Sequence, residues 1–287
     1  MAAFSLLIAT VNRTESLRRL LASLEEQSYR DFEILIADQN PPGFLDELYA
    51  EFQNTLPLRV ITVPDKGVSQ ARNALLPHAQ GQLVAFPDDD CWYEPETLEQ
   101  AVAFFAANPH VHAVLGQWHD PAGSIRLQAS GRAINRFSAF RRGGTLVQFY
   151  RKAVVDAVGG FDPELGPGTG TGLPYGCGED TDYVLRALAA GFAVVFTPSV
   201  RVCHPEVSLT SFSPEKIRSY ALGRMHLLRK HNLPLWFKLV NIAYPLLRAP
   251  LEGRKAWPYR KAMFFGRLAG FFDGWKKNMR ENSCVSP

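Results

Sequence analysis

The sequence predicts an α/β protein with a mostly parallel sheet flanked by helices, followed by a helical C-terminal extension. Short apolar runs alternate with segments of helical periodicity up to Thr197, and a helical pattern begins at Ser213-Pro214-Glu215. Strands that are separated by helices are typical of parallel sheets. The chain has 287 residues, of which 46% are hydrophobic, so it can bury a large core.

The elements follow in order along the chain. Apolar runs predict strands at 4–9, 32–37, 58–63, 82–86 and 193–197, and residues 145–150 alternate like a strand. Helical patterns lie between these runs, over 17–24, 69–76, 95–108 and 179–190. Asn12 with Glu15 predicts a capping box for the first helix. The segment 116–144 is polar and irregular, and 166–178 contains six glycines in GPGTGTGLPYGCG.

The charge of the chain is unevenly distributed. From Pro214 to the end there are 15 Lys/Arg and 4 Asp/Glu (+11), against 16 and 24 (−8) before it, which gives the net +3. We therefore expect two regions, 1–212 and a basic, aromatic region at 213–287. Such a tail suits an anionic surface, and a solvated helical face explains the charges equally well.

One segment of this tail, 259–277, has the pattern of a helix that lies on anionic lipid. A C-terminal helix packed on the domain is the alternative. No nucleic-acid recognition motif is present, so no nucleic acid is expected as a partner. The apolar face consists of Phe264, Phe265, Leu268, Phe272 and Trp275, with Arg260, Lys261, Arg267, Lys276 and Lys277 around it.

Compartment signals are few. The four cysteines show no CxxC pair and no zinc spacing, which indicates reduced cytoplasmic thiols. The N-terminal MAAFSLLIATVNR lacks a basic region before its apolar run, so we interpret it as a strand and not as a signal peptide. The longest apolar stretch, 233–250, is interrupted by Lys238, Asn241 and Arg248 and is too short to span a membrane.

Polar residues follow three of the predicted strands. In open α/β sheets, ligands bind at the carboxyl ends of strands. Thr10 and Arg13 follow the first strand, Asp38 follows the second, and the aspartates of FPDDD follow the fourth. Neither GxGxxG nor GxxxxGK[ST] occurs, so a nucleotide would have to be held by side chains and a metal ion.

Three consecutive aspartates, Asp88, Asp89 and Asp90, need positive charge nearby because adjacent carboxylates repel one another. Mn²⁺ or Mg²⁺ would meet this need and could also bridge a diphosphate. A cluster of acids at a helix start is the alternative, and it accounts well for one aspartate but not for three.

The motifs together resemble family 2 glycosyltransferases, which have the Rossmann-like GT-A fold. LLIATVNR, LASLEEQSY, FEILIADQN, GVSQARN, FPDDD, GGFDPEL and GEDTDYVLRALAAG occur in the family's order between residues 4 and 204. The resemblance implies donor contacts by Thr10, Asp38 and Arg72, and we place Arg13 beside them. Asp38-Gln39-Asn40 departs from the family's usual Asp-Asp-Gly-Ser.

The resemblance also implies a metal site and a base. Asp88 and Asp90 take the outer positions of the DxD motif, on the ribose and metal side and as metal ligand respectively. Asp89 is then the variable middle residue on the donor side, and His204 in VCHPE matches a late histidine that often completes the metal site. The xED motif makes Asp180, or its neighbour Glu179, the catalytic base, with Asp182 a further candidate. A helix start rich in acids is the alternative.

These residues imply an inverting, metal-dependent transferase that moves one sugar from a nucleoside-diphosphate sugar to an acceptor hydroxyl. UDP or dTDP sugars are the expected donors, and a sugar or lipid-linked sugar the acceptor, in surface polysaccharide or glycolipid assembly. The absence of a QxxRW motif favours single transfer over polymer synthesis. A sugar nucleotidyltransferase and an inactive nucleotide-sugar-binding module are the alternatives. A cytoplasmic protein, peripheral on the membrane face, is expected.

Overall fold

The computed structural model describes residues 3–120, 131–141, 144–167, 175–205 and 211–283, with side chains described up to Phe272 in the last range. The chain divides into two compact units. The α/β unit comprises Met1–Pro163 and Asp180–Glu206, and the helical unit comprises Glu164–Glu179 and Val207–Pro287. The assignment of separate functions to regions 1–212 and 213–287 stays a prediction.

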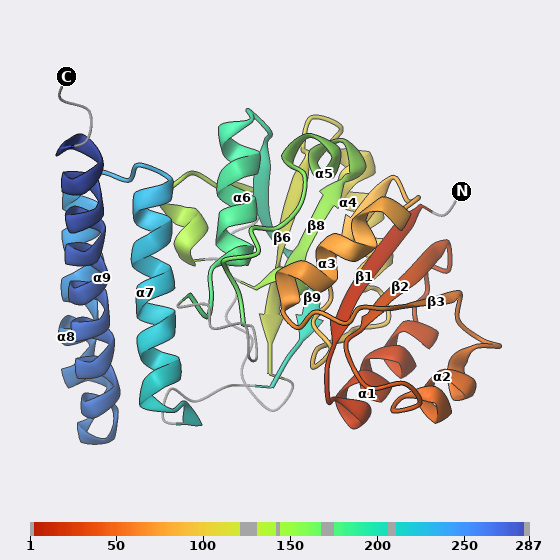
Figure 1. The fold of residues 1–287 in the computed structure, drawn as a ribbon. Helices are drawn as coiled ribbons and strands as arrows, with labels where there is room; N and C mark the ends of the chain where they lie inside the picture. The colour runs from red at the N-terminus through yellow and green to blue at the C-terminus, as the bar shows by residue number, and fades with distance from the viewer. Residues whose placement is uncertain (1–2, 121–130, 142–143, 168–174, 206–210, 284–287) are drawn as a thin grey trace. The chain divides into compact units, whose positions relative to one another are not determined.

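The described strands of the α/β unit form one mixed sheet (Figure 1). Their order is β3-β2-β1-β4-β8-β6-β9-β5, and β7 pairs with β9. β3, β2, β1 and β4 are mutually parallel, as is β6 with β9, whereas β8 runs antiparallel to both of its neighbours. The strands are β1 (Phe4–Thr10), β2 (Phe32–Asp38), β3 (Leu58–Thr62), β4 (Leu83–Ala85), β5 (Trp92–Tyr93), β6 (Ala113–His119), β7 (Arg132–Ala133), β8 (Gln148–Arg151) and β9 (Val194–Cys203).

Helices cover both faces of this sheet. On one face Phe4, Leu6 and Ile8 of β1 are buried in a core with apolar residues of α1, α2 and α4. On the other face α3 contacts β1 and β2, and α5 contacts β4 and β8. The period of two along β1 explains how one strand supplies both cores. The helices are α1 (Thr14–Glu25), α2 (Asp46–Phe52), α3 (Val68–Leu75), α4 (Thr97–Ala107), α5 (Lys152–Val158) and α6 (Glu179–Ala189).

The α/β class and the flanking helices are confirmed, and three local predictions are wrong. β6 begins before Gly116 and extends into the segment predicted to be irregular, and residues 145–147 form a 3₁₀ turn before β8 begins. The expected capping box is also absent, because Arg13 is the N-cap residue of α1 and its side chain makes no capping bond. Asn12 instead has a φ of 56°, and its backbone N–H donates to Oδ1 of Asn40.

The helical unit is built mainly from α7 (Pro214–Lys230), α8 (Leu235–Glu252) and α9 (Trp257–Ser283), and α9 contacts both of the others (Figure 1). Ser213 caps α7 as expected, since its hydroxyl accepts a bond from the Lys216 N–H. Close packing of α7 and α9 depends on two glycines. A Cβ at Gly266 would lie 2.7 Å from Cβ of Ala221, and one at Gly270 would lie 3.0 Å from Cβ of Met225.

Apolar side chains are concentrated on the outside of this helical unit. Ten of the thirteen exposed large hydrophobic residues in the described part of the chain belong to it. Seven of them lie on α8: Leu235, Trp236, Leu239, Val240, Tyr244, Leu247 and Leu251. Among the residues described, no helix combines the length and the apolar composition that crossing a membrane requires.

Candidate functional site

The candidate site lies at one edge of the sheet in the α/β unit. Thr10 is paired in register with Asp38 at the ends of β1 and β2, and Ala9 forms a bridge with Asp88 just beyond β4. These strands are parallel, so their carboxyl ends meet at a single edge. The fold therefore brings together residues that are 79 positions apart, since Thr10 Oγ1 donates a 2.9 Å hydrogen bond to Asp89 Oδ2.

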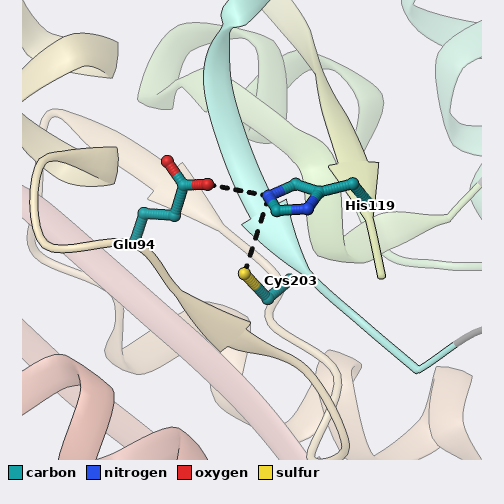
Figure 2. Close-up of side chains that lie close together, drawn as sticks. All are labelled: Glu94, His119 and Cys203. Atoms are coloured by element: carbon teal, nitrogen blue, oxygen red, sulfur yellow. Dashed lines mark hydrogen bonds and ion pairs between the residues drawn. The ribbon is translucent and has the colours of Figure 1, made fainter. Parts of the chain in front are cut away.

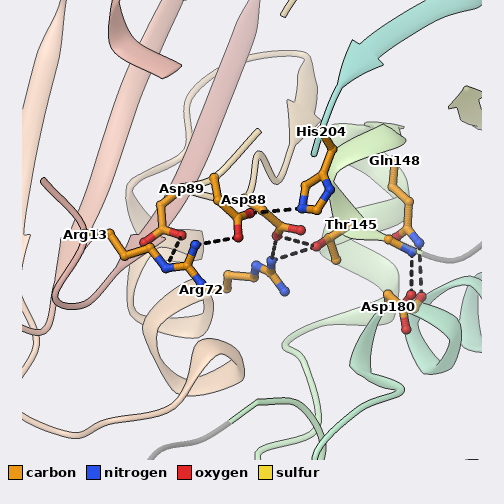
Figure 3. A network of polar contacts seen from close by, with 10 residues as sticks. Arg13, Arg72, Asp88, Asp89, Thr145, Gln148, Asp180 and His204 are labelled. Atoms are coloured by element: carbon orange, nitrogen blue, oxygen red, sulfur yellow. Dashed lines mark hydrogen bonds and ion pairs between the residues drawn. The ribbon is translucent and has the colours of Figure 1, made fainter. Parts of the chain in front are cut away.

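Each of the three aspartates faces a different combination of cationic side chains. Figure 3 shows Asp88 and Asp89 near Arg72 and Arg13. Asp88 Oδ1 lies 2.5 Å from Nη2 of Arg72, and Asp90 Oδ2 lies 2.5 Å from Nη1 of Arg13. Asp89 Oδ1 is 3.6 Å from Nε of Arg13. These arginines supply the positive charge that three consecutive carboxylates require.

Arg72 is almost completely buried, at 1% exposure, although it carries a full charge. Its Nη2 also donates to Oγ1 of Thr145 at 2.6 Å, and that hydroxyl donates to Asp88 Oδ1 at 3.0 Å. The Arg72 guanidinium lies 5.4 Å from the ring centre of Phe161. A buried charge persists only when it is paired and hydrogen-bonded, and this network meets that condition.

The aspartates differ in their acidity because their surroundings differ. Burial raises the pKa of Asp88, and Arg72 counteracts it. Burial also raises the pKa of Asp89 to about 6, against the opposing effects of Arg13 and Thr10. Burial acts in the same direction on Asp90, but the hydrogen bond from His204 and the charge of Arg13 outweigh it and lower the pKa to about 2. Asp90 is therefore ionised at neutral pH.

His204 joins the aspartates at the end of β9. Its Nε2 lies 3.3 Å from Oδ1 of Asp90, and its Nδ1 lies 2.7 Å from the carbonyl oxygen of Pro205. That carbonyl can accept only from an N–H, so it holds the proton on Nδ1 and leaves Nε2 to face Asp90. Carboxylate and imidazole donors in this arrangement fit Mn²⁺, with Asp88 contributing a third group. The hydrogen bond to Asp90 raises the pKa of His204.

Asp38 has both carboxylate oxygens engaged. Oδ1 accepts from the backbone and side-chain N–H groups of Asn40 at 2.9 and 2.7 Å, and Oδ2 accepts from the Tyr49 hydroxyl at 2.9 Å. Asn40 occupies the segment in which the sequence departs from the family pattern. It orients Asp38 and, through Oδ1, also holds the backbone N–H of Asn12. Burial raises the pKa of Tyr49, so that hydroxyl remains a donor.

Asp180 lies in the first turn of α6. Its Oδ2 accepts a 2.6 Å bond from the Gly144 backbone N–H, and its Oδ1 accepts from the Thr181 N–H, also at 2.6 Å. Gln148 Nε2 donates to the Asp180 carbonyl oxygen at 3.3 Å. Gly144 immediately precedes Thr145, which bonds Asp88, so one short segment contacts both the predicted base and the aspartate cluster (Figure 3).

The two acidic residues near Asp180, Glu179 and Asp182, lie in different environments. Asp182 is fully buried and its Oδ2 forms a 2.7 Å ion pair with Nε of Arg186, which leaves it unsuited to meet a substrate. Glu179 is 8% exposed and belongs to the helical unit. In the glycine-rich segment 166–178, residues 168–174 lie outside the described part of the chain.

The segment 116–148 was expected to supply sugar-pocket residues, but no individual role for Gly144, Thr145 or Gln148 could be predicted from the sequence. They lie in or just after a polar segment with no recognisable motif, and only the fold places them beside Asp88 and Asp180. A threonine at the start of a predicted strand gives no signal of its own. Tyr49 and Asn40 went unassigned for the same reason.

Comparison with known proteins adds to this geometry. The sequence profile described as "Glycosyl transferase family 2" matches residues 5–156, which is more than half of the chain. The chain belongs to glycosyl transferase family 2. The matched residues include β1 to β4 and the aspartate cluster, but Asp180 and His204 lie beyond them.

Individual relatives of the family are distant. Glycosyltransferase AglE of Haloferax volcanii is 26% identical over 258 residues, covering 81% of this chain and 79% of AglE. The poly(ribitol-phosphate) beta-N-acetylglucosaminyltransferase TarS of Staphylococcus aureus is 31% identical over 108 residues, covering 36% of this chain and only 19% of TarS.

Solved structures of two sugar transferases share the fold. TarS 1–349 of S. aureus, solved in complex with UDP-GlcNAc, has a TM-score of 0.62 at 17% identity, covering 96% of this chain and 92% of that one. The mannosyltransferase PcManGT of Pyrobaculum calidifontis, solved with GDP-Man and Mn²⁺, has a TM-score of 0.64 at 16% identity, covering 94% and 87%. This chain therefore has the GT-A type of fold, and α7, α8 and α9 follow its last strand in the sequence.

Proposed function

We propose that the chain is an inverting, non-processive glycosyltransferase that moves one sugar from a nucleoside-diphosphate sugar to an acceptor hydroxyl. The observation that carries the proposal is the network joining Asp88 and Asp90 to Arg13, Arg72 and His204 at the edge of the sheet. UDP-GlcNAc and GDP-Man in the related structures support a donor of this class. UDP and dTDP sugars are the donors we expect here.

The donor would lie across the ends of β1, β2 and β4. Thr10 and Asp38 would contact the base and ribose. Hydrogen bonds to Asp89 and from Tyr49, respectively, already orient these two side chains. Arg13 is 45% exposed in its side chain, so it can leave Asp90 and turn to an anionic diphosphate. Arg72 is buried and would keep Asp88 ionised and oriented, with Asp89 on the donor side of the site.

A divalent ion, Mn²⁺ or Mg²⁺, would be held by Asp90, Asp88 and His204 and would offset negative charge on the diphosphate leaving group. The remaining chemistry falls to Asp180. Its carboxylate would accept the proton of the acceptor hydroxyl while the oxygen forms a bond to the anomeric carbon and the bond to the diphosphate breaks. Attack from the face opposite the leaving group inverts the anomeric configuration.

Two backbone N–H groups hold the Asp180 carboxylate in place, those of Gly144 and Thr181. Hydrogen bonds to the charged form favour ionisation, which a base needs before it can take a proton. Glu179 is the second candidate for this role, because it precedes Asp180 in the same motif.

The acceptor we propose is a sugar or lipid-linked sugar presented at an anionic membrane, with the protein peripheral on its cytoplasmic face. The exposed apolar row on α8 supports this, as do the 15 Lys/Arg from Pro214 onward. The segment 259–277 was expected to form the lipid-facing surface, and its Phe265 and Phe272 are exposed. We now assign the larger part of that surface to α8.

Calorimetric titration of UDP, dTDP and GDP, with and without Mn²⁺, tests the donor site. We expect one nucleotide to bind, and its affinity to depend on Mn²⁺. Asp90→Ala should abolish the Mn²⁺-dependent increase in nucleotide affinity. Asp156 is an exposed carboxylate on α5, and Asp156→Ala should leave that increase intact. If a folded wild-type protein bound none of the three, the aspartates would be helix-start acids and the proposal would fail.

A further inference from the structure

A second cluster of metal-type ligands lies in the α/β unit at the ends of β5, β6 and β9 (Figure 2). Glu94 directly follows β5, His119 is the last residue of β6, and Cys203 is the last residue of β9. The strands bring them together, because Cys203 is in register with His119 on one side and with Trp92 on the other. The proposed transfer reaction has no role for any of the three.

The ligand atoms of this cluster converge on one point. His119 Nε2 lies 2.7 Å from Glu94 Oε1 and 3.7 Å from Cys203 Sγ, and all three atoms lie within 4.8 Å of one another. Ligand atoms around a tetrahedral Zn²⁺ are separated by about 3.3–3.6 Å, given bonds of roughly 2.0–2.3 Å. A small shift of the Glu94 carboxylate would bring the cluster to that spacing.

A relay for nucleophilic catalysis would look different. In such a relay the acid binds one nitrogen of the imidazole and the thiol faces the other. Here the carboxylate and the thiol both face Nε2 of His119, while the buried Nδ1 has no hydrogen-bond partner among the described residues. Convergence on one ring nitrogen suits three ligands around one ion and does not suit proton transfer through the ring.

The surroundings support ligation. The side chains of His119 and Glu94 are 11% and 21% exposed, and Cys203 is 5% exposed, so the cluster is shielded but reachable. Arg201 Nε forms a 2.9 Å ion pair with Oε2 of Glu94, while Oε1 faces the cluster. A partner that orients a ligand in this way is a usual feature of metal sites.

The cluster is separate from the aspartates, although Cys203 and His204 are adjacent in sequence. His204 turns to Asp90 and lies against the Trp118 ring, whereas Cys203 turns to His119. Neighbouring side chains along an extended segment point to opposite faces. The donor chemistry differs as well, because only this second cluster offers a sulfur.

We propose that Glu94, His119 and Cys203 bind a divalent transition-metal ion that accepts thiolate and imidazole ligands, with Zn²⁺ the principal candidate. Three protein ligands leave a fourth position for water. On binding, the Cys203 thiol releases its proton to solvent, the proton on Nε2 of His119 is replaced by one on Nδ1, and the freed sulfur and nitrogen lone pairs form the bonds to the ion, so no oxidant or reductant is needed. The ion would tie together the ends of three strands.

Co²⁺ serves as the probe, because bonding to a thiolate gives it a sulfur-to-metal charge-transfer absorption that oxygen and nitrogen ligands cannot produce. Titration of the whole chain with Co²⁺ should produce this band at one equivalent, and Zn²⁺ should remove it. The band should be lost in Cys203→Ser and persist in Cys177→Ser, whose thiol belongs to the helical unit. His119→Gln should weaken Zn²⁺ binding at least about 100-fold, against no change in the surface control His110→Gln.

Asp90→Ala should keep the band, so a failure of the donor site and a failure of this proposal give different results. Should Cys203→Ser fail to fold, the wild-type protein provides a second readout, namely alkylation of Cys203 measured by peptide mass spectrometry with and without Zn²⁺. Protection of Cys203 by Zn²⁺ supports the site. A band that survives Cys203→Ser, or a folded wild-type protein that shows neither band nor protection, overturns it.

Discussion

The backbone N–H of Gly144 donates a 2.6 Å hydrogen bond to the side-chain Oδ2 of Asp180. The next residue, Thr145, donates through its hydroxyl to Asp88 and accepts from Arg72. The proposed base and the proposed metal ligand are thereby positioned by two consecutive residues. The placement of Asp180 relative to Asp88 therefore depends on a single short segment of backbone. Substitutions of either aspartate and substitutions in this segment can be compared by experiment.

Replacing Asp180 by Asn should remove transfer and preserve donor binding. The amide has nearly the same shape but cannot accept the proton of the acceptor, so kcat should fall by about 10²–10⁴-fold. Turnover and calorimetric donor affinity should be measured on the same protein. Asp156→Asn, the same change on an exposed side chain of α5, should alter neither quantity. Near-normal turnover in Asp180→Asn would transfer the role to Glu179.

Thr145→Val should weaken the donor site without changing the shape of the side chain. Thr145 is buried, and the substitution leaves Arg72 and Asp88 each short of one hydrogen bond. We expect the free energy of unfolding to fall by about 1–3 kcal/mol. Donor Kd should rise about tenfold, which corresponds to 1.4 kcal/mol. Thr55→Val, on the surface, is the matched control in chemical denaturation and calorimetry. An unchanged Kd would show that the hydroxyl is dispensable for the site.

A pH-dependent contribution to stability is expected from Glu252 at the end of α8. Glu252 accepts hydrogen bonds from Arg260 and Arg248, and the bond from Arg260, opposed by partial burial, lowers its pKa. A carboxyl with a lowered folded pKa stabilises the protein above its unfolded pKa of about 4.3, and this contribution is lost as the pH falls through the folded value.

Glu252→Gln should therefore lower the Tm by about 2–4 °C at pH 7, and the difference from wild type should disappear near pH 3. Thermal unfolding followed by circular dichroism across this range provides the measurement. Glu15→Gln, whose 81% exposed side chain pairs with Arg18, should change the Tm much less. A difference that stayed constant with pH would mean that the charge of Glu252 is not its source.

Binding to anionic vesicles should depend on the apolar row of α8. Leu247 and Leu251 are 70% and 77% exposed, and replacing both by Gln removes apolar area without changing charge. Burying a leucine contributes about 1.5–3 kcal/mol, so the double variant should partition at least about 30-fold more weakly. Flotation with phosphatidylglycerol vesicles measures this, and Phe44→Gln in the α/β unit is the control. Equal flotation of both variants would remove α8 from the proposed lipid surface.

Much of the fold could be predicted because apolar runs mark the buried strands and a Ser-Pro-Glu sequence marks the start of a helix. The apolar runs at β1, β2 and β3 and the start of α7 at Ser213-Pro214 were located to within about one or two residues. β6 escaped prediction because Gly116 and the polar residues around it look irregular in sequence. Yet a Cβ at Gly116 would lie 2.5 Å from the carbonyl oxygen of Val200, so close strand approach explains the glycine.

Candidate site residues could be named from the sequence where they directly follow strands or lie in a recognisable motif, as Arg72 and Asp180 do. Asp88, Asp89 and Asp90 could be recognised because three adjacent carboxylates repel one another. In the structure, ion pairs with Arg13, Arg72 and His204 offset this negative charge. Sequence separation concealed the rest. Thr145 lies 73 positions from Arg72, and nothing local to a threonine indicates a partner that distant.

The direction of β8 has a practical consequence for anyone who modifies this chain. β8 runs opposite to β4, so the residues before β8 lie at the edge where β1, β2 and β4 end. Its last residue, Arg151, pairs with Leu83 at the start of β4, beside Phe4. A fluorophore or affinity tag attached ahead of Phe4, or near the start of α5, would thus be remote from the aspartates. The same label attached at Gly144 or Thr145 would lie directly beside Asp180 and Asp88.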